Sequence, residues 1–154
     1  MREIINKLIL TNKTISTMES CTGGGLANEI TSYEDASKVL KFSAVTYSNE
    51  YKIKMGVDEE IINKYTVYSI QTAHSMASSI SLYTNSNYGV GITGKLNKVD
   101  TNNPYGEDNI VFVSIFDRDN NLYYDLEIMV NKSSRKENKD VVISKIIDKL
   151  HEIL

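Results

Sequence analysis

The stretch TISTMESCTGGG, residues 14–25, decides the fold of this chain. Its first five residues, Thr14–Met18, are mostly β-branched and predict a short strand. The three consecutive glycines Gly23–Gly25 then predict a turn that leads into a helix, which we expect over Thr22–Tyr33. Because a strand that turns into a helix typically begins a βαβ unit, the stretch predicts an α/β fold.

Outward from this stretch, hydrophobic periodicity predicts four more strands and four more helices. The strands are expected at 42–48, 88–93, 110–116 and 122–130, and the helices at 2–11, 58–64, 69–83 and 135–154. Ser69 is a candidate N-cap of the third of these helices. The polar segment Asn97–Asp108 holds the only proline and is expected to be a loop.

The connections between these elements predict the topology of the sheet. Helices link the first three strands, which favours parallel pairing there. A loop joins strands three and four, and the tight turn Arg118–Asn121 joins strands four and five, so strand four should run antiparallel to both neighbours. We therefore expect a three-layer α/β/α sandwich that contains a five-stranded mixed sheet.

Composition excludes several classes of protein. The 154 residues fit one domain, 1–154, and the single cysteine excludes an internal disulfide and a cysteine-based zinc site. The two histidines lie far apart in sequence, so we expect no metal site, and nothing predicts a cofactor. A net charge of −3 argues against a nucleic-acid binder, and no apolar run is long enough to span a membrane. A reduced, cytoplasmic setting is the default expectation.

Ser20 is a candidate nucleophile because it lies between a strand and a glycine-rich helix start. A helix start offers unpaired backbone N–H groups, which can stabilise the oxyanion of acyl transfer or bind a phosphate. Two other interpretations stay open at this point. Ser20 or Thr22 can simply cap the helix, and Cys21 is a neighbouring alternative nucleophile, although no histidine–asparagine pair is present to activate it.

Lys52 is the candidate base for Ser20, because neither His74 nor His151 lies in a suitable pattern. A lysine can act as a base where burial or a nearby cation lowers its pKa. Lys52 follows the second strand, and the ends of two parallel strands meet at one edge of the sheet, where open α/β folds bind ligands. Alternatively, Lys52 is one of many solvated surface lysines.

At these residues the sequence resembles the CinA C-terminal domain family, of the nicotinamide-nucleotide amidase type, over nearly the whole chain. The motif ESCTGG stands intact as Glu19–Gly24, and the run V-T-Y-S-N-E-x-K followed by G-V is matched by Val45–Lys52 with Gly56-Val57. Further matches are Val67-Tyr68-Ser69 with Met76-Ala77, Thr93-Gly94, and Pro104-Tyr105-Gly106.

The resemblance implies an enzyme that hydrolyses the carboxamide of nicotinamide mononucleotide to nicotinic acid mononucleotide and ammonia. It implies Ser20 as nucleophile and Lys52 as base, without a metal or cofactor. The substrate, a pyridine nucleotide, would contact a larger set of residues: Thr22, Gly23, Gly24, Tyr47, Thr93, Gly94, Arg135 and Lys139. The helix start at Gly23–Gly25 would hold the oxyanion. Arg135 and Lys139 would bind the phosphate, or alternatively are only solvated residues of a helix start.

Two segments depart from the family pattern. The family loop T-G-x-A-G-P-x-G-G becomes Thr93–Asp100 (TGKLNKVD), without its A-G-P and its glycine pair. In the R-x-x-I/V-R motif, Lys139 replaces the second arginine and Asn138 replaces the apolar residue. Two alternative functions therefore stay open: a non-catalytic nucleotide-binding or regulatory module, and an amidase for another small amide. A homodimer is compatible with the resemblance. The apolar face of the last helix is a candidate dimer surface, although packing in the core explains that face equally well.

Overall fold

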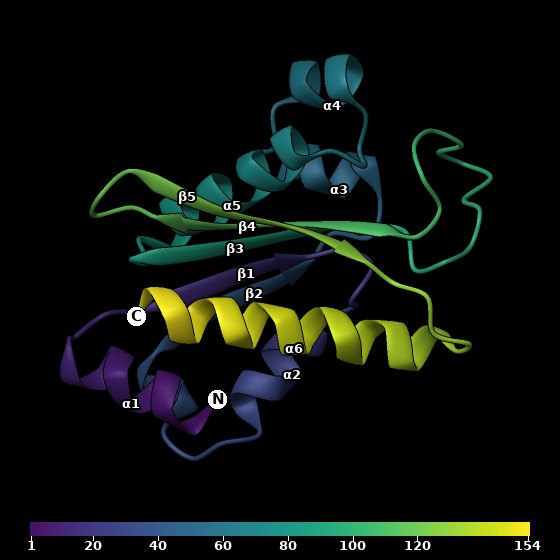
Figure 1. The fold of residues 1–154 in the computed structure, drawn as a ribbon. Coiled ribbons are helices and arrows are strands. Elements are labelled where there is room, and N and C mark those ends of the chain that lie inside the picture. Colours follow the sequence, from purple (N-terminus) through teal and green to yellow (C-terminus); the bar gives the residue numbers. More distant parts are fainter.

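A five-stranded sheet in the order β2-β1-β3-β4-β5 runs through the molecule in the computed structural model, which describes residues 1–154 (Figure 1). The strands are β1 (Ile15–Glu19), β2 (Leu40–Val45), β3 (Tyr88–Gly94), β4 (Ile110–Asp117) and β5 (Leu122–Met129). The helices are α1 (Arg2–Leu10), α2 (Gly25–Thr31), α3 (Asn49–Lys54), α4 (Glu59–Tyr65), α5 (Ile70–Thr84) and α6 (Arg135–Ile153), with a short 3₁₀ turn, η1, at Ala36–Lys38.

The pairing of the strands confirms the predicted mixed sheet. β1 pairs in parallel with both β2 and β3, whereas β4 runs antiparallel to β3 and to β5. The physical reason is the kind of connection, because parallel neighbours need a crossover, usually a helix, while antiparallel neighbours can be joined by a loop or a turn. The segment 97–108 between β3 and β4 contains neither helix nor strand, as expected.

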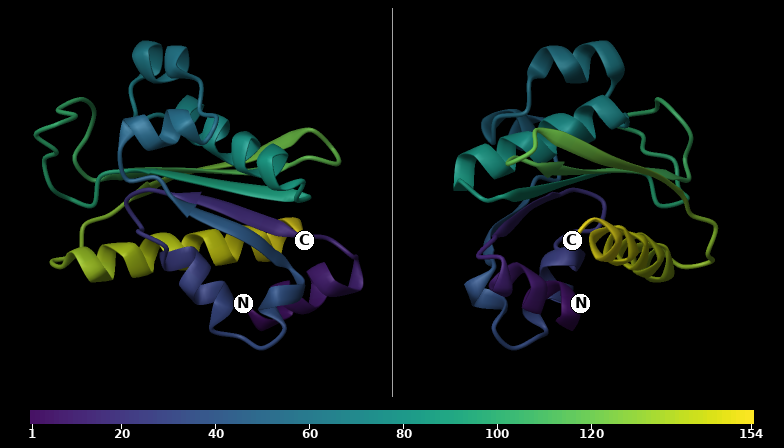
Figure 2. Two further views of the ribbon diagram at one scale, coloured as in Figure 1. Left: turned by 180° about the vertical axis from the view of Figure 1, so that it is seen from behind. Right: turned by 60° about the vertical axis from the view of Figure 1, so that its left-hand side comes forward.

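Helices cover both faces of the sheet, which confirms the three-layer sandwich (Figure 2). Helices α1, α2 and α6 lie on one face, and α3, α4 and α5 lie on the other (Figure 1).

Two glycines of β3 allow α5 to pack closely against the sheet. A Cβ atom on Gly89 would lie 2.0 Å from the Ala77 carbonyl oxygen, and one on Gly91 would lie 2.3 Å from that of Ala73. Only glycine therefore fits at these two positions.

The alternate residues of β3 build the larger of two apolar cores. Tyr88, Val90 and Ile92 belong to a buried cluster that also takes residues from α1 and α6. A smaller cluster on the opposite face includes Met18 from β1 and Met76 from α5. The sheet is thus buried on both sides, as expected for strands that helical crossovers connect.

Helix α3 is the main element that the sequence did not predict. It begins directly after the expected strand 42–48, which is shorter than predicted because β2 ends at Val45. The Ser48 hydroxyl caps the helix by accepting from Tyr51 N–H at 3.3 Å. The helix has six residues, and its only buried side chain is Lys52, so it carries no apolar periodicity. The predicted cap of α5 is confirmed, because Ser69 Oγ accepts from Thr72 N–H at 3.2 Å.

The chain changes direction at β1, and this positions the site. From β1 it crosses by way of α2 to β2 at one edge, and from β2 it returns through α3, α4 and α5 to β3 on the other side of β1. Such a switch point opens a crevice at the carboxyl ends of the strands, where open α/β sheets bind ligands. None of the helices combines the length and the apolar character that crossing a bilayer would need.

Candidate active site

The turn after β1 fixes Ser20 at the switch point. Gly23 and Gly24 follow it with φ angles of 63° and 88°, in the left-handed region that side chains disfavour. These two glycines reverse the chain tightly enough for α2 to start five residues after the serine. Ser20 is 8% exposed, and what remains exposed faces a cavity at the carboxyl ends of the strands.

Glu19 ties this turn to the first turn of α2. Its carboxylate is fully buried and accepts hydrogen bonds from the Thr22 hydroxyl at 2.6 Å, from Leu26 N–H at 3.1 Å and from Ala27 N–H at 2.9 Å. A buried carboxylate at a helix start satisfies donors that would otherwise have no partner. The motif ESCTGG therefore has a structural part, because Glu19 and Thr22 hold the turn while Ser20 faces the cavity.

Lys52 reaches Ser20 from α3. The side chain is 1% exposed, its Nζ atom lies 3.1 Å from Ser20 Oγ, and it donates to the Thr46 carbonyl at 2.8 Å. Burial lowers the pKa of Lys52 from 10.5 to about 8. A lysine with such a pKa is partly neutral near physiological pH and can accept a proton from a hydroxyl at hydrogen-bond distance.

The neighbouring candidates for nucleophile and base do not match this geometry. Cys21 is buried, and its burial raises the pKa of its thiol to about 12, so the thiolate is scarce at neutral pH. His74 Nε2 lies 2.8 Å from the Asp125 carboxylate on β5, and His151 Nε2 lies 2.6 Å from the Glu3 carboxylate. Neither histidine lines the cavity.

The cavity beside Ser20 and Lys52 has a volume of about 850 Å³, within the range of small-molecule sites. Of the residues that the sequence singled out, Tyr47, Gly94 and Arg135 line it together with the serine–lysine pair. The Arg135 guanidinium donates to the Tyr47 hydroxyl at 3.0 Å, and both side chains are exposed. The structure thus brings an arginine from the start of α6 to the mouth of the same cavity.

The structure does not bring the other expected contact residues to this cavity. Thr22, Gly23, Gly24 and Lys139 line a separate hollow between α2 and α6. Thr93 is fully buried, and its hydroxyl donates to the Val67 carbonyl at 2.8 Å, so it braces the end of β3 instead of facing the cavity.

The expected oxyanion donors are also engaged elsewhere. Gly23 N–H donates to the Ser20 carbonyl at 3.0 Å, and Gly25 N–H donates to the Thr22 carbonyl at 3.3 Å. The backbone N–H groups of Cys21, Thr22 and Gly24 donate to no backbone carbonyl. Of these three residues only Cys21 lines the cavity. Because Cys21 directly follows Ser20, its backbone N–H is the candidate oxyanion donor.

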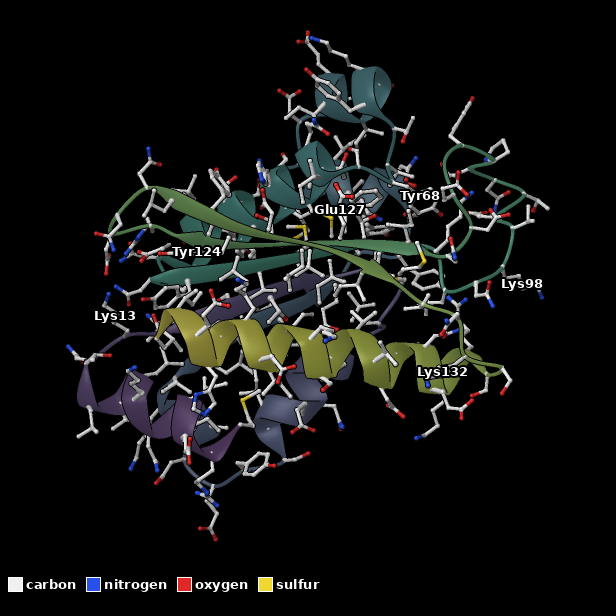
Figure 3. All side chains as sticks on the ribbon, in the orientation of Figure 1. Lys13, Tyr68, Lys98, Tyr124, Glu127 and Lys132 are labelled. Carbon is white, nitrogen blue, oxygen red and sulfur yellow. The ribbon has the colours of Figure 1, made fainter.

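The loop between β3 and β4 supplies residues that the sequence did not identify. Asp100 lines the cavity and accepts a hydrogen bond from the Tyr68 hydroxyl, and Lys95 is buried with its Nζ atom 2.9 Å from the Asp108 carboxylate. Figure 3 places Tyr68 and Lys98 at the end of the sheet from which this loop projects. No group of three or more histidine, cysteine, aspartate or glutamate side chains is arranged to hold a metal ion.

These features define an α/β domain with a buried serine–lysine pair at the switch point of a mixed sheet. The chain belongs to the CinA C-terminal domain family, whose profile matches residues 1–154.

Relatives support this assignment. The chain is similar to a CinA-like protein of Flavobacterium psychrophilum, with 40% identity over 116 residues that cover 73% of this chain and 27% of that protein. It therefore spans about a quarter of the length of this curated relative. It also resembles a solved competence/damage inducible protein of Agrobacterium tumefaciens, with a TM-score of 0.84, 28% identity, and coverage of 97% of this chain and 92% of that one.

A second solved structure shows the likeness of the fold alone. It is a competence damage-inducible protein of Klebsiella pneumoniae, with a TM-score of 0.86 at 20% identity, and the match covers 99% of this chain and 92% of that chain.

Proposed function

We propose that this chain is an amidohydrolase that deamidates a pyridine nucleotide, nicotinamide mononucleotide, to nicotinic acid mononucleotide and ammonia. The observation that carries the proposal is the 3.1 Å approach of Lys52 Nζ to Ser20 Oγ, with the lysine fully buried and its pKa lowered to about 8. The family resemblance of the motifs around both residues supports the choice of a carboxamide substrate.

In this mechanism Ser20 Oγ attacks the carboxamide carbon while neutral Lys52 takes the hydroxyl proton. The Thr46 carbonyl accepts an N–H of Lys52, which orients the lone pair of the amine toward Ser20. The ammonium of Lys52 then returns the proton to the leaving nitrogen, and ammonia departs. Water attacks the resulting acyl-enzyme with Lys52 again as base, which releases the carboxylate and restores the serine.

The backbone supplies the oxyanion donor in this proposal. Cys21 N–H donates to no backbone carbonyl and belongs to the residue that follows the nucleophile, which is the place from which acyl-transfer enzymes often take one donor. A preorganised donor of this kind contributes about 10²–10³-fold to turnover. The expectation of donors at Gly23 and Gly25 is replaced, because those groups are already paired.

Arg135 is the phosphate-binding residue in this proposal. Its guanidinium lies at the mouth of the cavity and uses one donor on Tyr47, which leaves the remaining donors free for phosphate oxygens. Lys139 lines another hollow, so this chain would hold the phosphate without the second arginine of the family motif.

The test is the release of ammonia from nicotinamide mononucleotide by the purified chain. Ser20→Ala and Lys52→Met should each abolish release, because each removes one partner of the pair. Lys54→Met is a matched control, since Lys54 lies on the same helix, is exposed, and should leave release unchanged. Ammonia release by Ser20→Ala equal to that of the wild type would refute the serine mechanism.

A non-catalytic nucleotide-binding module is the second candidate function. It is favoured by the loop after Gly94, which lacks the A-G-P and glycine pair of the family and lines the cavity with side chains. Calorimetric binding of nicotinamide mononucleotide without ammonia release would support it. Turnover of another carboxamide in a substrate panel would instead support an amidase of different specificity.

A further inference from the structure

Asp100 lies in the wall of the cavity without a cationic partner. It is the only carboxylate among the residues that line the cavity. Its oxygens accept from the Tyr68 hydroxyl, from Asn102 N–H at 2.9 Å and from the Asn103 side-chain amide at 3.1 Å. All three donors are neutral, and no lysine, arginine or histidine forms a salt bridge with Asp100.

The other acidic residue that ties down this loop behaves differently. Asp108 pairs with the buried ammonium of Lys95 at 2.9 Å, so the two charges neutralise one another. Asp100, by contrast, is fixed in place by dipoles that favour its charged form but cannot cancel its charge. The loop therefore presents one unneutralised negative charge to the cavity.

Asp100 is ionised at neutral pH. The Tyr68 hydroxyl that donates to the carboxylate holds the pKa of Asp100 below its usual value. The charge also acts on the catalytic pair, because the field of Asp100 raises the pKa of Lys52 against the larger effect of burial. The carboxylate and the serine–lysine pair thus share one electrostatic environment.

A fixed carboxylate in a binding cavity favours a ligand with a positive charge near it. When a nicotinamide is joined to ribose through its ring nitrogen, the ring is a pyridinium cation, and this nitrogen is two bonds from the ring carbon that bears the carboxamide. If Ser20 attacks the carboxamide, the cationic ring lies in the same cavity, and the wall of this cavity includes Asp100.

We propose, resting on the amidase function above, that Asp100 makes this site selective for a carboxamide on a cationic, N-substituted pyridinium ring over an uncharged aromatic amide of the same shape. Two cationic side chains at the cavity match the negative charge of the nucleotide phosphate. Lys98 and Arg135 line it, and neither forms a salt bridge, so they suit the phosphate end of the same zwitterionic nucleotide.

Binding calorimetry on a Ser20→Ala background tests this selectivity without turnover. The probes are nicotinamide mononucleotide and benzamide riboside 5′-monophosphate, an isostere whose ring carries no charge. We expect the cationic probe to bind about tenfold more tightly, and Asp100→Asn to reduce this preference to about twofold or less by weakening only that probe. Equal affinities for the two probes, no binding of the cationic probe, or an equal loss for both in Asp100→Asn would overturn the inference.

Three matched variants separate charge from loop anchoring. Asp100→Glu keeps the charge and should keep the preference, and Tyr68→Phe removes a hydrogen bond but no charge and should keep it as well. Glu107→Gln removes an exposed carboxylate of the same loop that lies outside the cavity lining and pairs with no cation, so it should leave the preference unchanged. Loss of the preference in Glu107→Gln would count against a local effect of Asp100.

The assay of ammonia release with Ser20 intact is read separately. A preference for the cationic probe without ammonia release would reject the proposed amidase function and keep the selectivity. Ammonia release without the preference would keep the amidase function and reject the role of Asp100.

Discussion

Replacement of the buried Lys52 by methionine should raise stability at neutral pH while it abolishes activity. Lowering the pKa of Lys52 from 10.5 to about 8 corresponds to about 3 kcal/mol of unfavourable free energy for holding the charged form in the folded state. Lys52→Met removes that cost, and it also removes two hydrogen bonds, to Ser20 and Thr46, each with a net value of about 1 kcal/mol. The expected gain at pH 7 is therefore about 1 kcal/mol.

The sign of this effect should reverse with pH. The pKa of Lys52 is depressed by folding, so the cost is fully present below about pH 8 and disappears as the pH rises toward 10.5, where the unfolded chain also loses its proton. At pH 10 the lost hydrogen bonds should dominate, and Lys52→Met should be less stable than the wild type by about 1 kcal/mol.

Urea denaturation of both proteins at pH 7 and pH 10 measures this difference directly, with Lys54→Met as the control on the exposed side of α3. The control should change stability by less than about 0.5 kcal/mol at either pH. A Lys52→Met protein that is equally destabilised at both pH values would refute the reasoning, because it would mean that folding does not disfavour the ammonium form of Lys52.

The value of kcat/KM should rise with pH through about 8, since only neutral Lys52 accepts the proton. Asp100→Asn should move this rise to lower pH, because it removes a carboxylate that raises the pKa of Lys52. An unmoved pH profile in stopped-flow or ammonia assays would contradict this. Cys21→Ser should retain activity within about threefold, because a thiol with a pKa of about 12 is not the nucleophile, and complete loss of ammonia release would contradict it. Gly91→Ala should lower the free energy of unfolding by about 3 kcal/mol, since the new Cβ would lie 2.3 Å from the Ala73 carbonyl oxygen. Gly106→Ala, which has open space around it, should lower the free energy of unfolding by only about 1 kcal/mol in the same denaturation experiment.

The sheet could be predicted from the sequence because local patterns determine it. Each strand has its own β-branched or apolar run, and the presence or absence of a helix in each connection indicates parallel or antiparallel pairing. Helix α3 could not be predicted, because its buried residue is a lysine, and a buried lysine does not contribute to an apolar pattern. The burial of Lys52 depends on its hydrogen bonds to Ser20 and to the Thr46 carbonyl, and these groups come together only when β1 and β2 are paired.

The proximity of Ser20 and Lys52 could nevertheless be anticipated, because both follow the carboxyl ends of adjacent parallel strands. The family resemblance added Thr93 as a substrate contact, yet the Thr93 hydroxyl donates to the Val67 carbonyl. Strand position fixes which edge a residue reaches, whereas the alternation of side chains and the neighbouring segment fix which way it faces. The sequence therefore predicts the edge of the sheet at which the site lies, but not which side chains face the cavity there.

The loop between β3 and β4 has a role in the structure that the sequence did not predict. In comparison with the family pattern, Lys95 and Asp100 show only that a flexible, glycine-rich backbone is absent. In the structure the loop is anchored, because Asp108 pairs with the buried Lys95 and Asp100 accepts from Tyr68. An anchored loop can position a side chain against a ligand, which a flexible backbone cannot do. In the proposed selectivity, this anchored loop therefore contributes to ligand choice, while the chemical step belongs to Ser20 and Lys52, 3.1 Å apart.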